Sequence, residues 1–124
     1  MSKYVDIYLL PIPDNNVEDY RKMAEAAGKL FRKHGALTYR EYVASDLKVP
    51  DGIMSFPTAL DIKDGETLIY AAVEFESEEH GNESMAKIMA DPELGAGMED
   101  MSGDDPMFDM KRMIYGGFRV LVNV

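Results

Sequence analysis

Residues 67–80 read TLIYAAVEFESEEH, and this stretch decides the fold. The odd-numbered residues from Ile69 to Phe75 form one wholly apolar face, which is the alternation typical of a strand in a sheet. Ser77 then stands as a helix N-cap, with two glutamates in the first turn where acidic side chains suit the helix dipole. We therefore predict a strand over Thr67–Glu76 that passes directly into a helix running to about Ala90.

Toward the N-terminus, three further elements precede this unit. Alternation predicts a first strand over Tyr4–Leu10, closed by two prolines. A helix with an apolar stripe starts after Asn15 or Asn16 and ends at Gly35, a residue suited to the left-handed stop of a helix. Leu37–Ala44 is rich in Thr, Tyr and Val and is expected to be the second strand.

The segment 45–66 carries turn residues and shows no helical periodicity. We expect it to be a long hairpin arm, with Ala59–Ile62 as a candidate short extra strand. After the second main helix, Asp91-Pro92 indicates a short helix to about Asp100, followed by an acidic loop over 102–106. Gly117–Val124 is expected to be the last strand.

The predicted order is βαββαβ, which makes the chain one α+β domain over residues 1–124. A four-stranded antiparallel sheet with both main helices on one face satisfies this order, as in the ferredoxin-like layout. We expect Val5, Ile7 and Leu9 to lie under the helices. The opposite face would then carry a mixed set of residues: Tyr4, Asp6, Tyr8, Leu10, Leu68, Tyr70, Ala72, Glu74, Arg119, Leu121 and Asn123.

That second face is too apolar to remain in water, so a partner surface is expected to cover it. A second copy of the same sheet is the simplest cover, because two-fold homodimers are the commonest assemblies. The sequence therefore predicts a homodimer that pairs sheet to sheet.

Composition excludes several classes of protein. The 124 residues carry a formal net charge of −10 and no cysteine. The absence of cysteine excludes a disulfide scaffold and a thiol nucleophile, and the negative charge argues against nucleic acid and anionic membrane surfaces as partners. No targeting signal or membrane-spanning stretch is recognised, so a cytoplasmic location is the expectation.

Several motifs resemble one bacterial family. These are Tyr4-Val5-Asp6 with Leu10-Pro11-Ile12-Pro13, His34-Gly35-Ala36-Leu37, Ser55-Phe56-Pro57, Met89-Ala90-Asp91-Pro92, and the run from Phe108 to Phe118. The chain resembles the small uncharacterised YbaA-like family over nearly its whole length. The resemblance implies the dimeric α/β-barrel superfamily, in which two ferredoxin-like protomers pack sheet to sheet, and it carries no established activity with it. The wider superfamily includes cofactor-free monooxygenases, isomerases, haem-binding enzymes and binding modules, and this kinship is one of fold alone.

Polar residues on the presumed uncovered face are the first candidates for chemistry. Asp6 and Glu74 are the candidate bases, because a carboxyl buried among tyrosines has a raised pKa that suits proton abstraction. Tyr8, Tyr70 and Arg119 are the candidate ligand-binding residues beside them. The competing interpretation is structural, with Arg119 paired to an acid and the tyrosines filling a dimer core.

Other candidates lie outside this set. His34 is a third candidate base, with Glu41 near it, although the end of a helix also favours a histidine for structural reasons. Lys111 and Arg112 form a basic pair that would meet an anionic group or bond within the protein.

Two features suggest cofactors only weakly. His80 occupies an acidic turn that would disfavour an anionic porphyrin, and the methionines spaced along Met98–Met113 suit packing or a flexible lid better than copper. We predict no metal site and no cofactor.

Two functions from different classes remain open. The first is a homodimer that binds a small, partly aromatic molecule and acts as a cofactor-independent oxygenase or isomerase by proton transfer. The alternative is a dimeric binding or interaction module without catalysis.

Overall fold

A computed structural model describes residues 3–94 and 107–124 of the chain. Its elements, in chain order, are β1 (Tyr4–Pro13), the 3-10 turn η1 (Asp14–Asn16), α1 (Val17–Lys33), β2 (Thr38–Val43), α2 (Phe56–Leu60), β3 (Glu66–Phe75), α3 (Glu78–Ala90), the 3-10 turn η3 (Met110–Arg112) and β4 (Ile114–Arg119). The chain folds as the expected α+β, ferredoxin-like arrangement with a four-stranded antiparallel sheet.

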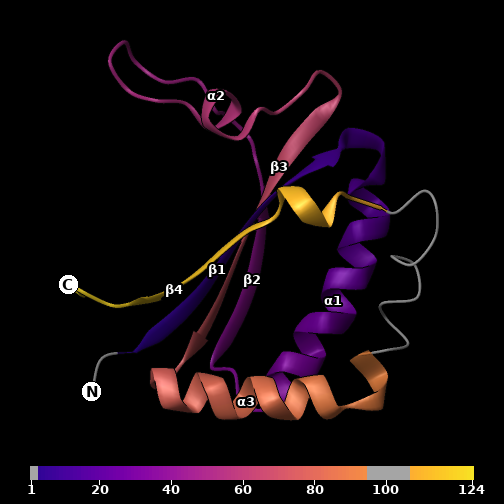
Figure 1. The fold of residues 1–124 in the computed structure, drawn as a ribbon, viewed down its shortest axis with the longest axis vertical. Helices are drawn as coiled ribbons and strands as arrows, with labels where there is room; N and C mark the ends of the chain where they lie inside the picture. The colour runs from indigo at the N-terminus through magenta and orange to yellow at the C-terminus, as the bar shows by residue number, and fades with distance from the viewer. Residues whose placement is uncertain (1–2, 95–106) are drawn as a thin grey trace.

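The strands are ordered β2-β3-β1-β4, so β1 and β3 lie at the centre of the sheet. Figure 1 shows α1 and α3 on one side of the sheet, with the arm that carries α2 and the C-terminal end extending away from the helices. The first helix packs its buried Tyr20 and Ala24 against Leu10 and Ile12 of β1. We call the side of the sheet under these helices the covered face and the other side the open face.

The strand register corrects the expected faces of β1 and β4. Tyr4 pairs with Phe75 and Asp6 with Val73, and antiparallel partners share a face, so these even-numbered residues lie on the covered face. The reason is the length of β1. It continues to Pro13, and the deeply buried Ile12 belongs to the same even-numbered set.

Val5, Ile7 and Leu9 therefore lie on the open face, not under the helices as expected. In β4 the same correction applies. Phe118 pairs with Val5 and lies on the open face, whereas Arg119 pairs with Tyr4 on the covered face.

The prolines of β1 do not end the strand, contrary to expectation. Pairing with β4 stops at Leu9, and beyond that residue β1 is bonded on the β3 side only. Pro11 lacks a backbone N–H and is tolerated where a strand has a free edge.

The last strand is Ile114–Arg119, whereas Gly117–Val124 was expected. Its pairing with β1 runs from Leu9 to Tyr4, and the N–H of Val120 makes a final bond to the carbonyl of Lys3. Beyond that point no described strand lies opposite, so the apolar tail remains exposed, with Leu121 90% exposed.

The arm contains the short helix α2 where a short extra strand over Ala59–Ile62 was expected. The Ser55 hydroxyl accepts a hydrogen bond from the N–H of Thr58, and Pro57 lies in the first turn, where its missing N–H costs nothing. These two signals identify a helix start, although the segment is too short to show apolar periodicity.

Other predictions hold. Ser77 caps α3 through the N–H of His80, α3 ends at Ala90, and Gly35 takes a φ of +110° after α1.

Asn16 precedes α1 without capping it, because its side-chain amide donates to the carbonyl of Met107. The helix expected from Pro92 to Asp100 is seen over residues 92–94, and its remainder and the acidic loop lie outside the described residues.

Within residues 3–94 and 107–124, no helix is long and apolar enough to cross a membrane.

Candidate functional site

Tyrosines and carboxylates gather between the covered face of the sheet and α1. β1 contributes three residues, β2 two, and β4 and α1 one each, and alternation within each strand aims them at the same side. We call this set the tyrosine–carboxylate cluster: Tyr4, Asp6, Tyr8, Tyr20, Tyr39, Glu41 and Tyr115.

Asp6 is the deepest member of the cluster, with 2% of its surface exposed. Its Oδ1 accepts a hydrogen bond of 2.9 Å from the hydroxyl of Tyr115. Burial raises the pKa of Asp6, and the hydroxyls of Tyr115 and Tyr4 offset part of that rise by stabilising the carboxylate. Asp6 is thus a carboxyl whose affinity for a proton is increased by its surroundings.

Glu41 is the second carboxylate and is held by two phenols. The hydroxyls of Tyr20 and Tyr39 donate to its two oxygens. Burial, and then the charge of Glu41, raise the pKa of both tyrosines, so they remain protonated donors.

Tyr8 links the two halves of the cluster. Burial and the charges of Asp6, Tyr4 and Glu41 raise the pKa of Tyr8 to about 12. Among the described residues, its hydroxyl donates to none, while its ring lies 4.9 Å from that of Tyr115. A protonated phenol without an acceptor is thus available between two carboxylates.

Small residues make room for these rings. A Cβ at Gly117 would lie 2.5 Å from Cζ of Tyr4 and would also collide with its hydroxyl, and a Cβ at Gly28 would lie 2.7 Å from Cδ1 of Tyr39. Ala71 of β3 pairs with both Tyr8 and Glu41, so the shortest side chain in that row lies between them. The small residues at these three positions therefore leave room for the tyrosine rings of the cluster.

The cluster opens toward solvent at one edge of the sheet. Tyr115 lies on the edge strand β4 and is 56% exposed, whereas the Asp6 that it contacts is buried. A buried carboxyl with a raised pKa, joined to the surface through a tyrosine, has the chemistry of a general base.

The structure separates the residues expected on one uncovered face. Asp6, Tyr8 and Arg119 lie on the covered face, while Tyr70 and Glu74 lie on the open face. The expectation of a single set was wrong because it rested on the wrong parity for β1. Tyr70 packs against Tyr42 across the open face, with ring centroids 5.5 Å apart.

His34 lies at the junction of α1 and α3. Its Nε2 is 2.7 Å from Oδ2 of Asp91, which also accepts a hydrogen bond from Lys33. Hydrogen bonding by His34, the N–H of Glu93 and Lys33 lowers the pKa of Asp91 to about 2. These contacts join two helix ends, and none of them reaches Asp6 or Glu41.

Arg112 and Lys111, the basic pair, have different surroundings. Arg112 donates to both oxygens of Glu66, at 2.7 and 3.1 Å, and to the carbonyl of Asp61 at 2.7 Å, so it ties η3 to the base of the arm. Lys111 is exposed and makes no ion pair among the described residues. Neither residue contacts the cluster.

Residues that suggested cofactors have local partners. Nδ1 of His80 accepts the N–H of Glu76, and the ring packs edge-on against Phe75. Met107 and Met113 pack against the core, whereas Met98 and Met101 lie outside the described residues. Within the described part of the chain, no three His, Asp or Glu side chains are grouped to hold a metal ion.

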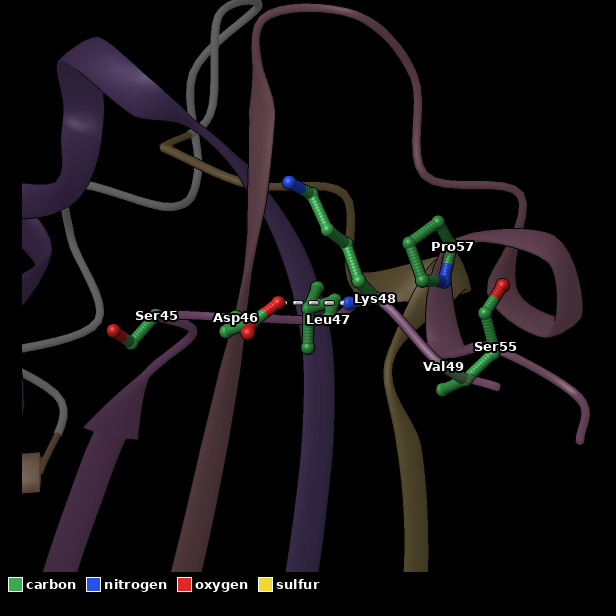
Figure 2. Close-up of a pocket in the computed structure, with 7 residues that line it drawn as sticks. All are labelled: Ser45, Asp46, Leu47, Lys48, Val49, Ser55 and Pro57. Carbon is green, nitrogen blue, oxygen red and sulfur yellow. Dashed lines mark hydrogen bonds between the residues drawn. The ribbon is translucent and has the colours of Figure 1, made fainter. Parts of the chain in front are cut away.

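The arm carries an open hollow of about 490 Å³. Figure 2 shows its lining, in which Ser55 and Pro57 of the α2 end face the extended segment from Ser45 to Val49. Inside it, the N–H of Lys48 is bonded to Asp46 of the same segment. No acid or base lies deeply buried there, so it does not compete with the cluster as a site for chemistry.

Four cluster members were missed by the sequence analysis as site residues: Tyr4, Tyr20, Tyr39 and Tyr115. A signal for two of them was present. Tyr4-x-Asp6 and Tyr39-x-Glu41 each place a tyrosine two residues before a carboxylate, on the same face of a strand. The other two come from elements far apart in the sequence and needed the tertiary structure.

A family model and a bacterial relative both match most of the chain. The model of a family described as a protein of unknown function (DUF1428) matches residues 3–110. The uncharacterized protein YbaA of Escherichia coli strain K12 is 37% identical over 122 residues, which are 98% of this chain and 98% of that protein.

Solved structures share the fold at low sequence identity. A NIPSNAP family protein of unknown function from Agrobacterium tumefaciens matches with a TM-score of 0.61 at 14% identity, over 96% of this chain and 88% of that one. A dimeric ferredoxin-like protein from an uncultured marine organism matches with 0.58 at 13%, over the full length of both. SnoaB, a cofactor-independent oxygenase from Streptomyces nogalater, matches with 0.55 at 10%, over 100% of this chain and 98% of that one.

Proposed function

The chain belongs to the DUF1428 family of proteins of unknown function, and we propose that it is a homodimer that binds a small, partly aromatic molecule in the tyrosine–carboxylate cluster, where Asp6 accepts a proton from it. The observation that carries this proposal is the state of Asp6. A carboxyl that is 2% exposed and has no basic partner among the residues that the structure describes is costly to keep charged, and such costs are typical of functional sites.

The proposed step is a proton transfer. The Asp6 carboxylate takes a proton from an acidic C–H or O–H of the bound molecule, and the electron pair stays on that molecule as an enolate or phenolate. Tyr8 remains protonated and donates a hydrogen bond to the developing negative charge, while the hydroxyl of Tyr115 stays bonded to Asp6. Return of the proton at another position is an isomerisation, whereas oxygenation requires dioxygen as a further reactant.

Fold likeness supports this class of reaction. SnoaB is described as a cofactor-independent oxygenase, so the arrangement of sheet and helices that it shares with this chain accommodates chemistry of that kind. The support lies in the fold, and the assignment of Asp6 rests on the geometry of this chain.

Binding of a simple phenol tests the proposal. We expect 4-ethylphenol to bind the wild-type chain, detected by saturation-transfer NMR, and Ala71→Leu to abolish the signal by filling the space between Tyr8 and Glu41. Ala86→Leu, on the exposed side of α3, is the matched control and should bind as wild type does. Tyr115→Phe, which removes the hydroxyl that reaches Asp6, serves as a second variant should Ala71→Leu not fold. Equal binding by the site variants and the control would refute the site.

The non-catalytic alternative is favoured by one observation, the apolar open face. Ile114 is 46% and Phe118 58% exposed on it, beside Val5, Ile7 and Leu9. A dimer built on this face would serve an interaction module equally well. Native mass spectrometry together with the phenol titration separates the two functions: a dimer that binds no phenol supports the interaction module, and a dimer that binds one phenol per protomer supports the proposed site.

A further inference from the structure

We infer that the tyrosine–carboxylate cluster selects a small organic cation, a protonated amine or nitrogen base carried on an aromatic or apolar body. This inference rests on the proposed function, because it names the chemical class of the molecule that occupies the same site. It follows from the charges, the aromatic rings and the burial of the cluster.

The cluster holds two carboxylates and no basic side chain. None of the ion pairs formed within residues 3–94 and 107–124 involves Asp6 or Glu41, because the lysines and arginines that pair do so elsewhere. The sequence of residues 95–106, GAGMEDMSGDDP, contains no Lys, Arg or His that would add a side-chain cation.

Among the residues paired in the sheet, Arg119 is the one cation on the covered face, and it is exposed. It pairs with Tyr4, two register positions from the Asp6–Gly117 pair, and forms no ion pair with Asp6. Burial raises the pKa of Asp6, and the hydroxyls of Tyr115 and Tyr4 lower it. Charge compensation for Asp6 therefore has to come from a bound molecule or from a proton.

Hydrogen bonds do not replace that compensation. Tyr20 and Tyr39 donate to Glu41, and Tyr115 donates to Asp6, but a neutral phenol leaves the net charge of the site negative. An isolated carboxylate loses much solvation free energy on burial, and a cation at hydrogen-bond distance restores part of it. A negatively charged ligand would instead make the free energy of the buried carboxylates less favourable, because like charges repel.

The aromatic rings favour the same ligand. Tyr8 and Tyr115 pack against each other, with their ring centroids 4.9 Å apart at an interplanar angle of 40°, so a ligand would meet the ring faces and edges that are turned away from this contact. The faces of such rings attract ammonium groups, and the attraction grows as water is excluded. Strand spacing of about 4.8 Å puts the backbones of Tyr8 and Glu41 roughly 10 Å apart, with the short side chain of Ala71 between them on the covered face.

Three probes of one shape and different charge test the inference by isothermal titration calorimetry at pH 7 on the full chain. They are tyramine, which is a cation, 4-ethylphenol, which is neutral, and 4-hydroxyphenylacetate, which is an anion. We expect tyramine to bind about 10-fold more tightly than 4-ethylphenol, as one partly desolvated cation–π and ion-pair contact would give, and the anion to bind most weakly.

Charge-removing variants identify the source of the preference. Asp6→Asn and Glu41→Gln should each bring the Kd of tyramine toward that of 4-ethylphenol while leaving the Kd of 4-ethylphenol nearly unchanged. Glu83→Gln, which removes an exposed carboxylate from α3 with the same change in net charge, should leave the preference for tyramine intact.

The outcomes separate this inference from the proposed function. Binding of the neutral or anionic probe as tight as that of tyramine overturns the inference and leaves the proposed site standing. A tyramine preference that persists in both cluster variants and weakens equally in Glu83→Gln also overturns it, since the general negative charge of the protein would then explain the binding. Failure of all three probes to bind contradicts both.

Discussion

Asp6 shows how much one residue depends on strand parity. Its side chain is enclosed because Asp6 belongs to the even-numbered set of β1, together with Leu10 and Ile12. On the other face the same side chain would point away from the helices. Its chemistry, a carboxyl with a raised pKa, is thus a consequence of register and not of the local sequence alone.

Asp6→Asn should stabilise the chain at neutral pH. A folded-state pKa above the unfolded value means that the folded chain binds the proton of Asp6 more tightly, so stability falls as pH rises through that folded pKa. The uncharged amide avoids this loss. We expect a gain on the order of 1 kcal/mol, typical of relieving a functional strain, or roughly 3–5 °C in Tm.

The pH profile provides the check on this prediction. The difference in Tm between Asp6→Asn and wild type should be largest near pH 7 and should shrink as pH falls through the raised pKa of Asp6 toward the ordinary aspartate value of about 4. A variant less stable than wild type at pH 7 would assign Asp6 a structural role.

Gly117→Ala should displace Tyr4 from Asp6. The added Cβ would lie 2.5 Å from Cζ of the Tyr4 ring, so the ring has to move. Overpacking of this kind costs about 1–3 kcal/mol, measured by urea denaturation. Gly116→Ala is the matched control, because its Cβ would meet only Phe118, at 3.3 Å, on the open face. Equal losses in the two variants would contradict the proposed fit between Gly117 and Tyr4.

At the scale of elements, a hydrogen-bonded junction joins the ends of α1 and α3. His34 follows α1, Asp91 follows α3, and their side chains meet at 2.7 Å with Lys33 beside them. α3 buries Gly81, Ser84 and Ile88, two of which are small, so polar contacts at its end help to place it.

Asp91→Asn should therefore destabilise the chain in a pH-dependent way. The pKa of Asp91 is lowered to about 2, so its charge contributes stability above the ordinary aspartate range, and that contribution is lost as pH falls from about 4 toward about 2. Thermal denaturation should show a lower Tm than wild type at pH 7 and a much smaller difference at pH 2.5. Glu93→Gln, an exposed neighbour, is the control, and a gap that does not change with pH would exclude the charge of Asp91 as its cause.

At the scale of the whole molecule, exposed apolar side chains gather away from the helices. The arm exposes Val49, Ile53, Met54 and Phe56, and the tail after β4 exposes Leu121 and Val122. The arm and the C-terminal end both extend to the side of the sheet opposite α1 and α3 (Figure 1). A second copy packed on the open face would contact both the arm and the tail.

Phe118→Lys should break such a dimer. Two-fold symmetry places the charge in the interface twice, so we expect dimer affinity to fall by about 100-fold or more, seen as monomer in native mass spectrometry. Met89→Lys, which charges an exposed apolar residue of α3, should leave the dimer intact. Dissociation of the Met89 variant alone would move the interface to the helix side.

Local patterns were sufficient for most elements. The alternation of β3, the Ser77 cap, the stripe of α1 and the Gly35 stop depend on neighbours a few residues away, and each was predicted. The errors at β4 and α2 have other causes. The end of β4 is determined by the length of β1 opposite it, and α2 is too short to show periodicity.

The sequence by itself determined the order of elements, the antiparallel sheet, the acidic and cysteine-free character, and the candidate status of Asp6, Tyr8 and Glu41. Only the tertiary structure decided which face of β1 is covered, because Tyr4–Leu9 carries large side chains on both faces and pairing with Ile69–Phe75 selects between them. It likewise separated Glu74 and Tyr70 from Asp6 and brought Tyr20 and Tyr115 to the carboxylates. Alternation determines which residues share a face within one strand, but only packing against a helix determines which face is buried.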